Sequence, residues 1–223
     1  MTEKIILDLC GGSGAWSRPY KEAGYDVHVL TLPEYDVKKC WLNSADKQLE
    51  FINQKTGECL LIPVQNVCGV LAAPPCTEFS IAKGGKPRDF AGAMDIVRAC
   101  MQIVWFCRAY GSLQFWALEN PRGFLRQFLG KPAFTFEQWQ FGELRKKPTD
   151  IWGYFNTPKE TVRQMPFQMV GKSRAHAKDW AVIECPREHE QYIAQFKGDA
   201  KRAALRAITP HGFATAFFRA NKP

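Results

Sequence analysis

The sequence of 223 residues contains no run of eighteen or more apolar residues, which argues against a membrane-spanning helix. Its eight cysteines form no CxxC pair, and it has no internal repeat and no low-complexity segment. The first residues lead into an apolar strand and carry acidic side chains, so no secretory signal peptide is expected. Cys68, Cys100 and Cys107 lie in apolar segments, where free cysteine behaves as a small hydrophobic residue. These features predict a protein of a reducing, cytoplasmic compartment with no membrane partner.

The net charge of +8 is concentrated in the last third of the chain. Residues 1–144 hold 15 basic and 15 acidic residues, whereas residues 145–223 hold 15 basic and 7 acidic residues. A one-sided surplus is expected of a region that binds a polyanion, and a well-solvated surface is the alternative interpretation. Charge does not distinguish DNA from RNA. The candidate phosphate-binding residues are Arg145, Lys147, Arg163, Lys172 and Arg174.

The apolar periodicity predicts an α/β protein with a doubly wound, mostly parallel sheet. Apolar runs predict strands at 4–9, 27–32, 59–64, 67–73, 115–118 and 151–155. Helices are predicted at 16–23, 43–53, 93–110 and 210–221, and a turn is predicted at 55–58. The order strand, helix, strand over residues 67–118 requires parallel pairing.

The composition changes beyond Gly142 and predicts three regions. Residues 1–155 form a catalytic and cofactor-binding core. Residues 156–205 are polar, basic and interrupted by prolines, which predicts a small recognition lobe. Residues 206–223 form a last helix that returns to the core. The prediction is therefore one α/β domain with a small basic addition.

A glycine-rich turn follows the first predicted strand and opens a helix. It reads Asp8-Leu9-Cys10-Gly11-Gly12-Ser13-Gly14. Glycines let the backbone approach a ligand closely, and the start of a helix offers free N–H groups. The spacing differs from the G-x-G-x-x-G of dinucleotide sites, so a smaller adenosyl ligand fits better. Glu34 and Asp36 are alternative partners for its ribose or adenine, and a purely structural turn is the other interpretation.

Two reactive side chains follow two other predicted strands. Cys76 comes after Pro74 and Pro75, and Glu119 ends the strand at 115–118. Backbone N–H groups near Cys76 would lower the pKa of its thiol, and burial would raise the pKa of Glu119. A nucleophile and a proton-holding carboxyl at the ligand-binding edge of a sheet suit covalent chemistry on an electron-poor ring. An inert thiol and a loop-capping carboxylate are the structural alternatives.

Together these motifs resemble the carbon-5 cytosine methyltransferases over most of the chain, in that family's own order. The glycine turn is similar to D-L-F-x-G-x-G, Pro74-Pro75-Cys76 with Ser80 to P-C-x-x-x-S, and Glu119-Asn120 to E-N-V. Pro121 stands in place of the valine. Residues 145–149 lie where the family has Q-x-R-x-R, with Lys147 and Thr149 in place of its arginines. Residues 208–214 lie where the family's chain returns to the cofactor pocket. The compact organisation of the chain resembles that of small bacterial or phage-type members of this family.

The resemblance implies S-adenosylmethionine as cofactor, S-adenosylhomocysteine as its product, and no metal. The implied cofactor-binding residues are Asp8, Leu9, Cys10, Gly11, Gly12, Gly14, Trp16, Asp36 and Pro75. The implied substrate-binding residues are Pro74, Ser80, Asn120, Arg145 and Thr149, and the implied catalytic residues are Cys76, Glu119 and Lys147. Cys10 departs from the family's aromatic residue beside the cofactor, and Trp16 is the candidate to supply a ring instead.

The implied reaction methylates carbon 5 of cytosine in DNA. Cys76 adds to carbon 6 while Glu119 donates a proton or hydrogen bond to ring nitrogen 3, which makes carbon 5 nucleophilic. The target base must leave its stack, at a cost of a few kcal/mol. Phosphate contacts from the basic third would offset that cost. The short lobe implies a short recognition site or help from another subunit.

Four alternatives remain at the level of sequence. The first is the same reaction on RNA, because some family members modify transfer RNA. The second is an amino-directed methyltransferase, which Cys76 disfavours because such enzymes place an aromatic residue there. The third is a nucleic-acid-binding relative without turnover. The fourth is a metal site at Cys185 and His189, which are four residues apart but have no second pair.

Overall fold

A six-stranded sheet forms the centre of the computed structural model, which describes residues 4–143, 147–164 and 185–223. Its strand order is β2-β1-β6-β7-β9-β8. The strands are β1 (Ile5–Leu9), β2 (Asp26–Leu30), β6 (Val67–Ala72), β7 (Phe115–Pro121), β8 (Phe134–Glu137) and β9 (Pro148–Tyr154). The pairs β2–β1, β1–β6 and β6–β7 are parallel, whereas β9 pairs antiparallel with β7 and with β8. The chain is therefore an α/β protein with a mixed, mostly parallel sheet.

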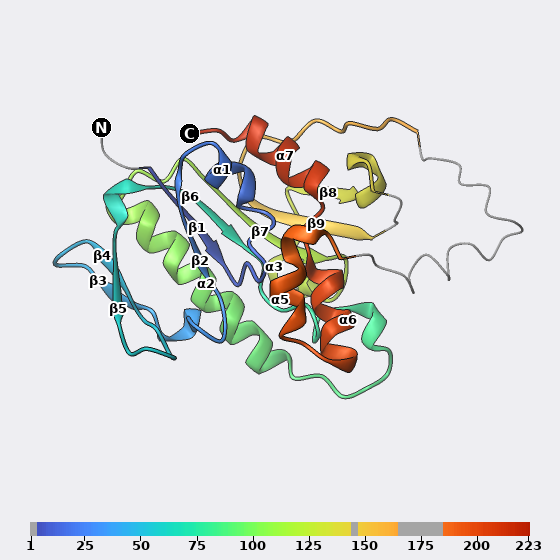
Figure 1. The fold of residues 1–223 in the computed structure, drawn as a ribbon, viewed down its shortest axis with the longest axis horizontal. Helices are drawn as coiled ribbons and strands as arrows, with labels where there is room; N and C mark the ends of the chain where they lie inside the picture. Colours follow the sequence, from blue (N-terminus) through green and yellow to red (C-terminus); the bar gives the residue numbers. More distant parts are fainter. Residues whose placement is uncertain (1–3, 144–146, 165–184) are drawn as a thin grey trace, which may run out of the picture.

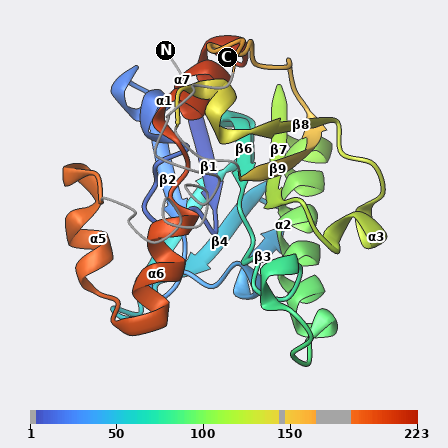
Figure 2. The same ribbon diagram turned by 90° about the vertical axis from the view of Figure 1, so that its right-hand side faces the viewer.

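Helices cover both faces of this sheet (Figure 2). One face carries α2 (Phe90–Tyr110), and the other carries α1 (Arg18–Glu22) and α7 (His211–Ala220). Alternate residues of β1 divide between the two cores, since Ile5 and Leu7 share a cluster with α2 and Ile6 shares one with α7. The predicted parallel strand–helix–strand unit of β6, α2 and β7 is confirmed. Burial on both faces explains why these strands read as continuous apolar runs.

Helix α2 is the longest helix among the described residues. The Asp89 side chain accepts a hydrogen bond from the Gly92 amide at its start, and Gly111 ends it. By length and composition alone this helix is apolar enough to cross a membrane. Its residues Val97, Cys100 and Val104 are buried in the cluster that it shares with the sheet. The apolar character of α2 therefore has a role in the core of this fold.

A small antiparallel sheet lies between β2 and β6 in the sequence and beside the main sheet in space (Figure 1). It consists of β3 (Trp41–Asn43), β4 (Gln48–Ile52) and β5 (Cys59–Pro63). The predicted helix at 43–53 is wrong, whereas the predicted turn at 55–58 and the strand that follows it are confirmed. Leu49 and Phe51 are buried while Glu50 and Ile52 face outward. That period of two is the pattern of a half-buried strand.

Short helices connect the larger elements. They are η1 (Val37–Lys39), η2 (Val64–Asn66), η3 (Ile81–Lys83), α3 (Leu125–Leu129), η4 (Gln138–Phe141), η5 (Arg187–His189), α5 (Glu190–Ala194) and α6 (Gly198–Ala207). The last three belong to the region predicted as a recognition lobe. Figure 1 shows α5 and α6 beside the ends of the central strands. Much of that predicted lobe, residues 165–184, lies outside the described residues.

Strand β7 is longer than its apolar run predicts. Glu119 and Asn120 lie within the strand and not after it, because β9 continues the pairing as far as Pro121. Asp150 of β9 stands opposite Asn120. Its fully buried carboxylate accepts two hydrogen bonds of 2.6 Å from Arg126 and one of 2.8 Å from Thr135. This bidentate ion pair joins α3 to β9, and the Thr135 hydrogen bond joins β8 to the same carboxylate, next to the end of β7.

We expect Arg126→Met to destabilise the protein, because it leaves the Asp150 carboxylate buried without its partner. The Asp150 carboxylate is buried whereas the Arg126 side chain is 38% exposed, so we expect a loss of about 2 kcal/mol in free energy of unfolding, the cost of a buried acceptor without its partner. The measurement is urea unfolding followed by circular dichroism, with Arg98→Met as control. Arg98 pairs with Asp95 on the exposed side of α2, where such pairs contribute little. Equal midpoints for both variants would contradict the structural role of the Arg126–Asp150 pair.

Candidate functional site

The strand order reverses between β1 and β6, which marks a ligand-binding crevice in an open α/β sheet. The chain leaves β1 toward β2 on one side, while β6 and β7 lie on the other side. Ligands bind outside the carboxyl ends of the strands at such a switch point. The glycine turn follows β1, Cys76 follows β6, and Glu119 lies near the carboxyl end of β7. The sheet thus brings the three sequence motifs to one edge.

Backbone contacts hold the Cys76 loop against the end of β7. The buried Asn120 side chain donates a hydrogen bond of 2.9 Å from Nδ2 to the carbonyl of Pro74. The Phe124 amide donates one of 2.9 Å to the carbonyl of Phe79. Ser80 and Gly123 form an isolated antiparallel bridge. Asn120 and Pro74 therefore position the cysteine loop, and their burial leaves them little surface for a substrate.

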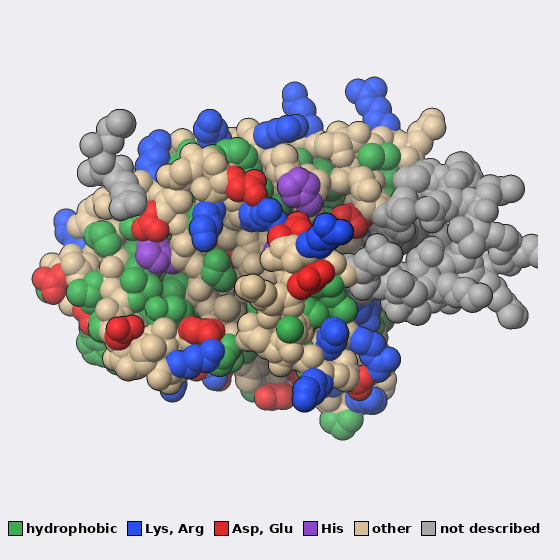
Figure 3. Space-filling view, viewed as in Figure 1, with side chains coloured by type: hydrophobic (Ala, Val, Ile, Leu, Met, Phe, Trp, Pro, Cys, Tyr) green, Lys and Arg blue, Asp and Glu red, His purple; other side chains and the backbone are tan. Residues whose placement is uncertain are grey.

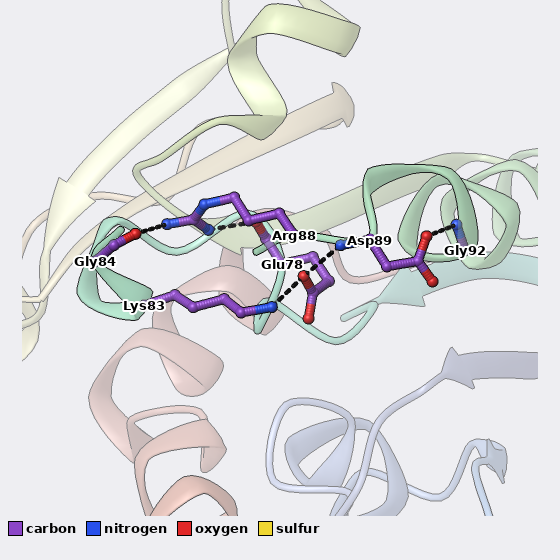
Figure 4. Close-up of polar contacts among 6 residues, drawn as sticks. All are labelled: Glu78, Lys83, Gly84, Arg88, Asp89 and Gly92. Atoms are coloured by element: carbon purple, nitrogen blue, oxygen red, sulfur yellow. Dashed lines mark hydrogen bonds and ion pairs between the residues drawn. The ribbon is translucent and has the colours of Figure 1, made fainter. Parts of the chain in front are cut away.

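The loop between Cys76 and α2 is organised by Glu78 (Figure 4). The Glu78 carboxylate pairs with Lys83 and accepts a hydrogen bond of 2.8 Å from the Asp89 amide. Arg88 donates to the carbonyls of Glu78 and Gly84, at 2.5 and 3.1 Å. This network closes the loop on itself. Ser80, implied to bind substrate, caps η3 by accepting a hydrogen bond of 3.2 Å from the Ala82 amide.

The Cys76 thiol is partly exposed and protonated at rest. Burial raises the pKa of Cys76, and the positive charges of Lys147 and Arg206 lower it, while the Glu119 charge raises it. The prediction of a lowered pKa for this thiol is wrong, because desolvation outweighs the nearby cations and backbone N–H groups. The thiol is therefore the favoured form of Cys76 at neutral pH.

The surroundings of Glu119 favour the protonated form of its carboxyl. Burial raises its pKa, the Lys147 charge lowers it, and the Asp150 charge raises it. The prediction of a raised pKa is confirmed in direction. A neutral Glu119 no longer raises the pKa of Cys76, so protonation of the carboxyl favours ionisation of the thiol.

Lys147 lies between the Cys76 site and α6. Its Nζ donates a hydrogen bond of 2.9 Å to the carbonyl of Arg206. Arg206 was not predicted from the sequence, since nothing in its local pattern places it near a cysteine 130 positions earlier. Thr149 is buried and donates to the carbonyl of Lys147. Arg163 is exposed, and the predicted phosphate-binding residues Arg145, Lys172 and Arg174 lie outside the described residues.

The glycine turn is closed by a hydrogen bond between buried side chains. Ser17 donates from Oγ to Oδ2 of Asp8 at 2.6 Å. Oδ1 of Asp8 is buried and has no hydrogen-bond partner among the described residues. A Cβ on Gly11 would lie 2.2 Å from the Asp8 carboxylate, so only glycine fits there. Burial raises the pKa of Asp8 to about 6.

The other implied cofactor residues fall into two groups. Leu9 and Trp16 are buried, and the Trp16 ring contacts Phe213 and Phe217 in the core. Cys10 and Gly12 have positive φ values of 56°, which turn the chain at the end of β1. Gly14 also has a positive φ and lies close to Val29. Asp36 caps η1, and Pro75 is exposed. The second group lies at the turn or near it, whereas Trp16 belongs to the core.

Two cavities lie behind the glycine turn, between α1 and the segment that begins η5. One of about 180 Å³ is lined by Ala15, Arg18, His189, Thr209, Pro210 and His211, among others. The second, of about 250 Å³, includes Ser13, Gly14, Ser17 and Val29. Arg18, Glu188 and His189 line both. Residues from 208–214 thus reach the space behind the turn.

The hypothesis of a metal site finds no support in the described part of the chain. No group of three His, Cys, Asp or Glu side chains there is placed to hold a metal ion. The Cys185 thiol contacts the carbonyl of Pro186 at 3.5 Å. His189 is buried beside α1 and lines the cavities. Cys185 and His189 therefore have no further metal ligands beside them among the described residues.

We expect the buried Asp8 carboxyl to make the protein less stable as pH rises. Its folded pKa of about 6 exceeds the ordinary 3.8, so the folded state holds this proton more tightly than the unfolded chain. The contribution is fully present below pH 3.8 and is lost as pH rises through about 6. It amounts to about 3 kcal/mol. The free energies of unfolding of wild type and Asp8→Asn are measured in urea below pH 3.8 and above about pH 6, and the difference between the two proteins should change across this range. A difference that does not depend on pH would contradict the prediction.

No known protein family matches the chain, and no curated protein matches it. The strongest grouping in the described structure is a thiol, a carboxyl of raised pKa and two cations at the switch point of the sheet. The glycine turn lies at the same edge of the sheet.

Proposed function

We propose that this chain is an S-adenosylmethionine-dependent methyltransferase that modifies carbon 5 of cytosine in DNA. The observation that carries the proposal is the electrostatic coupling of Cys76, Glu119 and Lys147 at the edge of the sheet. A nucleophile next to a proton donor, with a cation that acts on both, suits addition to an aromatic ring. The mixed sheet, with its glycine turn after β1, supports the methyltransferase fold that the sequence motifs imply.

The residues at the glycine turn fit an adenosyl cofactor. Gly11 has room for no side chain, and the buried Oδ1 of Asp8 has no hydrogen-bond partner among the described residues. The turn therefore places, at the end of β1, a backbone segment without a side chain and a carboxylate oxygen without a hydrogen-bond partner among the described residues. Bound S-adenosylmethionine supplies an electrophilic methyl group. The residues that would hold it are Asp8, Cys10, Gly11, Gly12 and Gly14.

Cys76 and Glu119 perform the proposed activation of the cytosine ring. The Cys76 sulfur forms a bond to carbon 6, and its proton leaves to the surrounding water. Glu119 in its neutral form donates its proton to ring nitrogen 3, where the negative charge from the addition would otherwise collect. Carbon 5 then carries the nucleophilic electron pair. After transfer, a base takes the carbon-5 proton, the Cys76–carbon 6 bond breaks to return the thiolate, and the proton on ring nitrogen 3 goes back to Glu119, which restores the aromatic ring.

Lys147 has a defined electrostatic role in this proposal. Its charge lowers the pKa of Cys76 and also that of Glu119. It therefore stabilises the thiolate at the moment of addition and the carboxylate after proton donation. The hydrogen bond from Lys147 to the Arg206 carbonyl holds α6 next to the reacting groups.

The surface around α6 supports a polyanionic substrate. Lys and Arg side chains gather over this helix (Figure 3), where Lys197, Lys201, Arg202 and Arg206 are exposed. Phosphate contacts from such residues contribute affinity without sequence information. The helix lies beside the catalytic pair, so a nucleic acid bound there would present its bases to Cys76. The same surface also suits RNA, which is the second candidate substrate.

We expect incubation with methyl-labelled S-adenosylmethionine and duplex DNA to give labelled 5-methylcytosine after nucleoside digestion. A parallel reaction with transfer RNA identifies the polymer, and a heat-treated protein sample is the control. Labelled methyl groups on RNA alone would identify RNA, the second candidate, as the substrate. Label on the exocyclic amino group, or no label on either polymer, would contradict the proposed reaction.

We expect Cys76→Ser to abolish methyl transfer and to leave cofactor binding nearly unchanged, because only the nucleophile is removed. The matched control is Cys59→Ser, an exposed thiol on β5. Oligonucleotides with 5-fluorocytosine should crosslink to Cys76 of the wild type, as read by peptide mass spectrometry. Normal turnover by the Cys76→Ser variant would show that the reaction does not pass through this thiol.

We expect Glu119→Gln to lower the rate by about 10²–10⁴, the usual contribution of a positioned acid. Because the pKa of Glu119 is raised, its acid form is present below that pKa and is lost as pH rises through it. The wild-type rate should therefore fall at high pH, and this fall should be absent in the Gln variant. The control is Glu58→Gln, an exposed position before β5. An unchanged pH profile in Glu119→Gln would refute the acid role.

A further inference from the structure

An arginine lies between two exposed aromatic rings at the C-terminal end of α2. The guanidinium carbon of Arg108 is 5.8 Å from the ring centroid of Trp105, which precedes it by one turn of α2, and 5.8 Å from that of Tyr154, at the end of β9. The Trp105 ring also lies 6.3 Å from the ring of Trp116 on β7. We call these four residues the arginine–aromatic cluster. They come from three elements that the sheet brings together.

The pairing of β7 with β9 places two of the rings side by side. Trp116 stands directly opposite Tyr154 in this antiparallel pair. Gly153 permits the close pairing, because a Cβ at this position would meet the carbonyl oxygen of Trp116. Its φ of 150° also favours glycine. Helix α2 then packs on the same face of the sheet and adds Trp105 and Arg108.

The cluster is separate from the Cys76 site. Trp116 and Glu119 lie three positions apart on β7, so their side chains point to opposite faces of the sheet. Trp116 packs against the apolar cluster that contains the residues of α2, whereas Ile151, which stands opposite Glu119, belongs to the cluster that contains α7. A ligand on the arginine–aromatic cluster therefore leaves the reacting groups free.

The rings of the cluster are open to solvent although they are large and apolar. Trp105 is 52% exposed, and Tyr154 is 65% exposed. Trp16, by contrast, is 2% exposed in the core. Single exposed apolar residues are common on protein surfaces, but a group of them next to one another indicates an interaction surface.

The charge at the cluster is positive and unbalanced within the described ranges. The Arg108 side chain makes no hydrogen bond or ion pair to any described residue. The sequence has no acidic residue at 96–118, 121–136 or 151–159, the stretches that form the cluster and the segment beside it. That segment carries the exposed Lys131, directly after Gly130, whose carbonyl accepts a hydrogen bond of 3.0 Å from Trp152 of β9. The surface therefore complements an anion.

Exposed rings beside a free guanidinium suit an unpaired nucleic-acid strand. Its bases stack on aromatic side chains, and its phosphates accept hydrogen bonds from arginine. A duplex offers phosphates but no free base faces, because each base is covered by its neighbours. A purely apolar partner would leave Arg108 without a counter-charge. The combination of stacking surface and cation thus favours a strand that is both anionic and unpaired.

We propose that Trp105, Arg108 and Tyr154 form a second nucleic-acid site, which binds an unpaired stretch of DNA. The two rings stack on bases, and the Arg108 guanidinium binds a phosphate between them. The basic surface of α6 has exposed cations, whereas this site adds base stacking to charge. The choice of DNA over RNA rests on the proposed function, and the stacking surface itself does not.

The first test is photo-crosslinking of the wild-type protein to a single-stranded oligodeoxynucleotide of about 12 nucleotides. The oligodeoxynucleotide contains 5-iododeoxyuridine, and the crosslinked residues are mapped by peptide mass spectrometry. We expect crosslinks to Trp105 and Tyr154. The internal control is Trp41, which is 68% exposed on β3 and has no described cation over its ring. Crosslinks that leave the cluster unmodified, at Trp41 or elsewhere, would overturn the inference.

The second test measures the affinity for the same oligodeoxynucleotide by fluorescence anisotropy. Trp105→Ala and Tyr154→Ala should each weaken binding about tenfold, the usual loss for one stacked base, and Arg108→Gln should weaken it several-fold. Trp41→Ala should bind like the wild type. Each variant should bind duplex DNA like the wild type, because the duplex has no free base faces. Equal losses for the single strand and the duplex would contradict a stacking site.

A conservative variant separates binding from folding. Tyr154→Phe keeps the ring and removes only the hydroxyl, so its affinity for the single strand should equal that of the wild type. Because Tyr154 is 65% exposed, thermal unfolding of Tyr154→Ala and Tyr154→Phe should occur at the same temperature. A loss of affinity in Tyr154→Phe as large as that in Tyr154→Ala would rule out stacking on this ring.

Other occupants of the cluster give different results. A single-stranded RNA of the same sequence that binds while the DNA does not would overturn the assignment to DNA. A second copy of the chain on these rings would appear as a dimer in size-exclusion chromatography. If that dimer dissociates in Tyr154→Ala and the wild type gives no crosslink at the cluster, the inference fails.

The fate of this inference is distinguishable from that of the proposed function. Cys76→Ser should bind the single strand like the wild type, because the cluster lies apart from the reacting thiol. If the wild type crosslinks at the cluster but transfers no methyl group, the methyltransferase proposal fails and the second site stands. If it transfers methyl groups but the cluster stays unmodified, the second site fails and the methyltransferase proposal stands.

Discussion

Parallel pairing of β1, β6 and β7 is the constraint on which the candidate site depends. Three parallel neighbours end at the same edge of the sheet, and the reversal of strand order leaves that edge open between β1 and β6. Motifs that are about 65 and 110 residues apart in sequence therefore meet. The hydrogen bond from Asn120 to the Pro74 carbonyl then fixes the spacing between two of them. Without the parallel register, Cys76 and Glu119 would share no surroundings.

Burial at this edge changes the chemistry of both reactive groups in the same direction, toward the neutral form. For Glu119 this is an advantage, because a neutral carboxyl is able to donate a proton. For Cys76 it is a cost, because the nucleophile is the thiolate. Lys147 and Arg206 reduce that cost without removing it. The thiol form of Cys76 is therefore favoured in the structure without ligand.

The last part of the chain completes the edge that the sheet leaves open. Helix α6 contributes Arg206 beside Cys76, α5 contributes Tyr192 beside Gly12, and α7 packs its phenylalanines against the glycine-turn side of the sheet. The same segment carries much of the positive charge of the molecule (Figure 3). The residues that lie near the glycine turn and the exposed basic residues of α6 therefore come from one stretch of sequence. The exposed basic residues lie outward, while His189 and Tyr192 face the turn.

The sequence by itself determined five of the six strands of the main sheet, the long helix α2 and the positions of the three motifs, because apolar runs and glycine turns report local conformation and burial directly. It did not predict β8, which is only four residues long. It did not determine the small sheet, where a period-two pattern over residues 48–52 resembles a helix when read without its partners. Only the tertiary structure decided that Trp16 belongs to the core, that Arg206 reaches the site, that Tyr192 lies beside Gly12, and that the pKa of Cys76 is raised. Each of these depends on contacts between residues far apart in the chain, and desolvation of a side chain is a property of its surroundings and not of its neighbours in sequence.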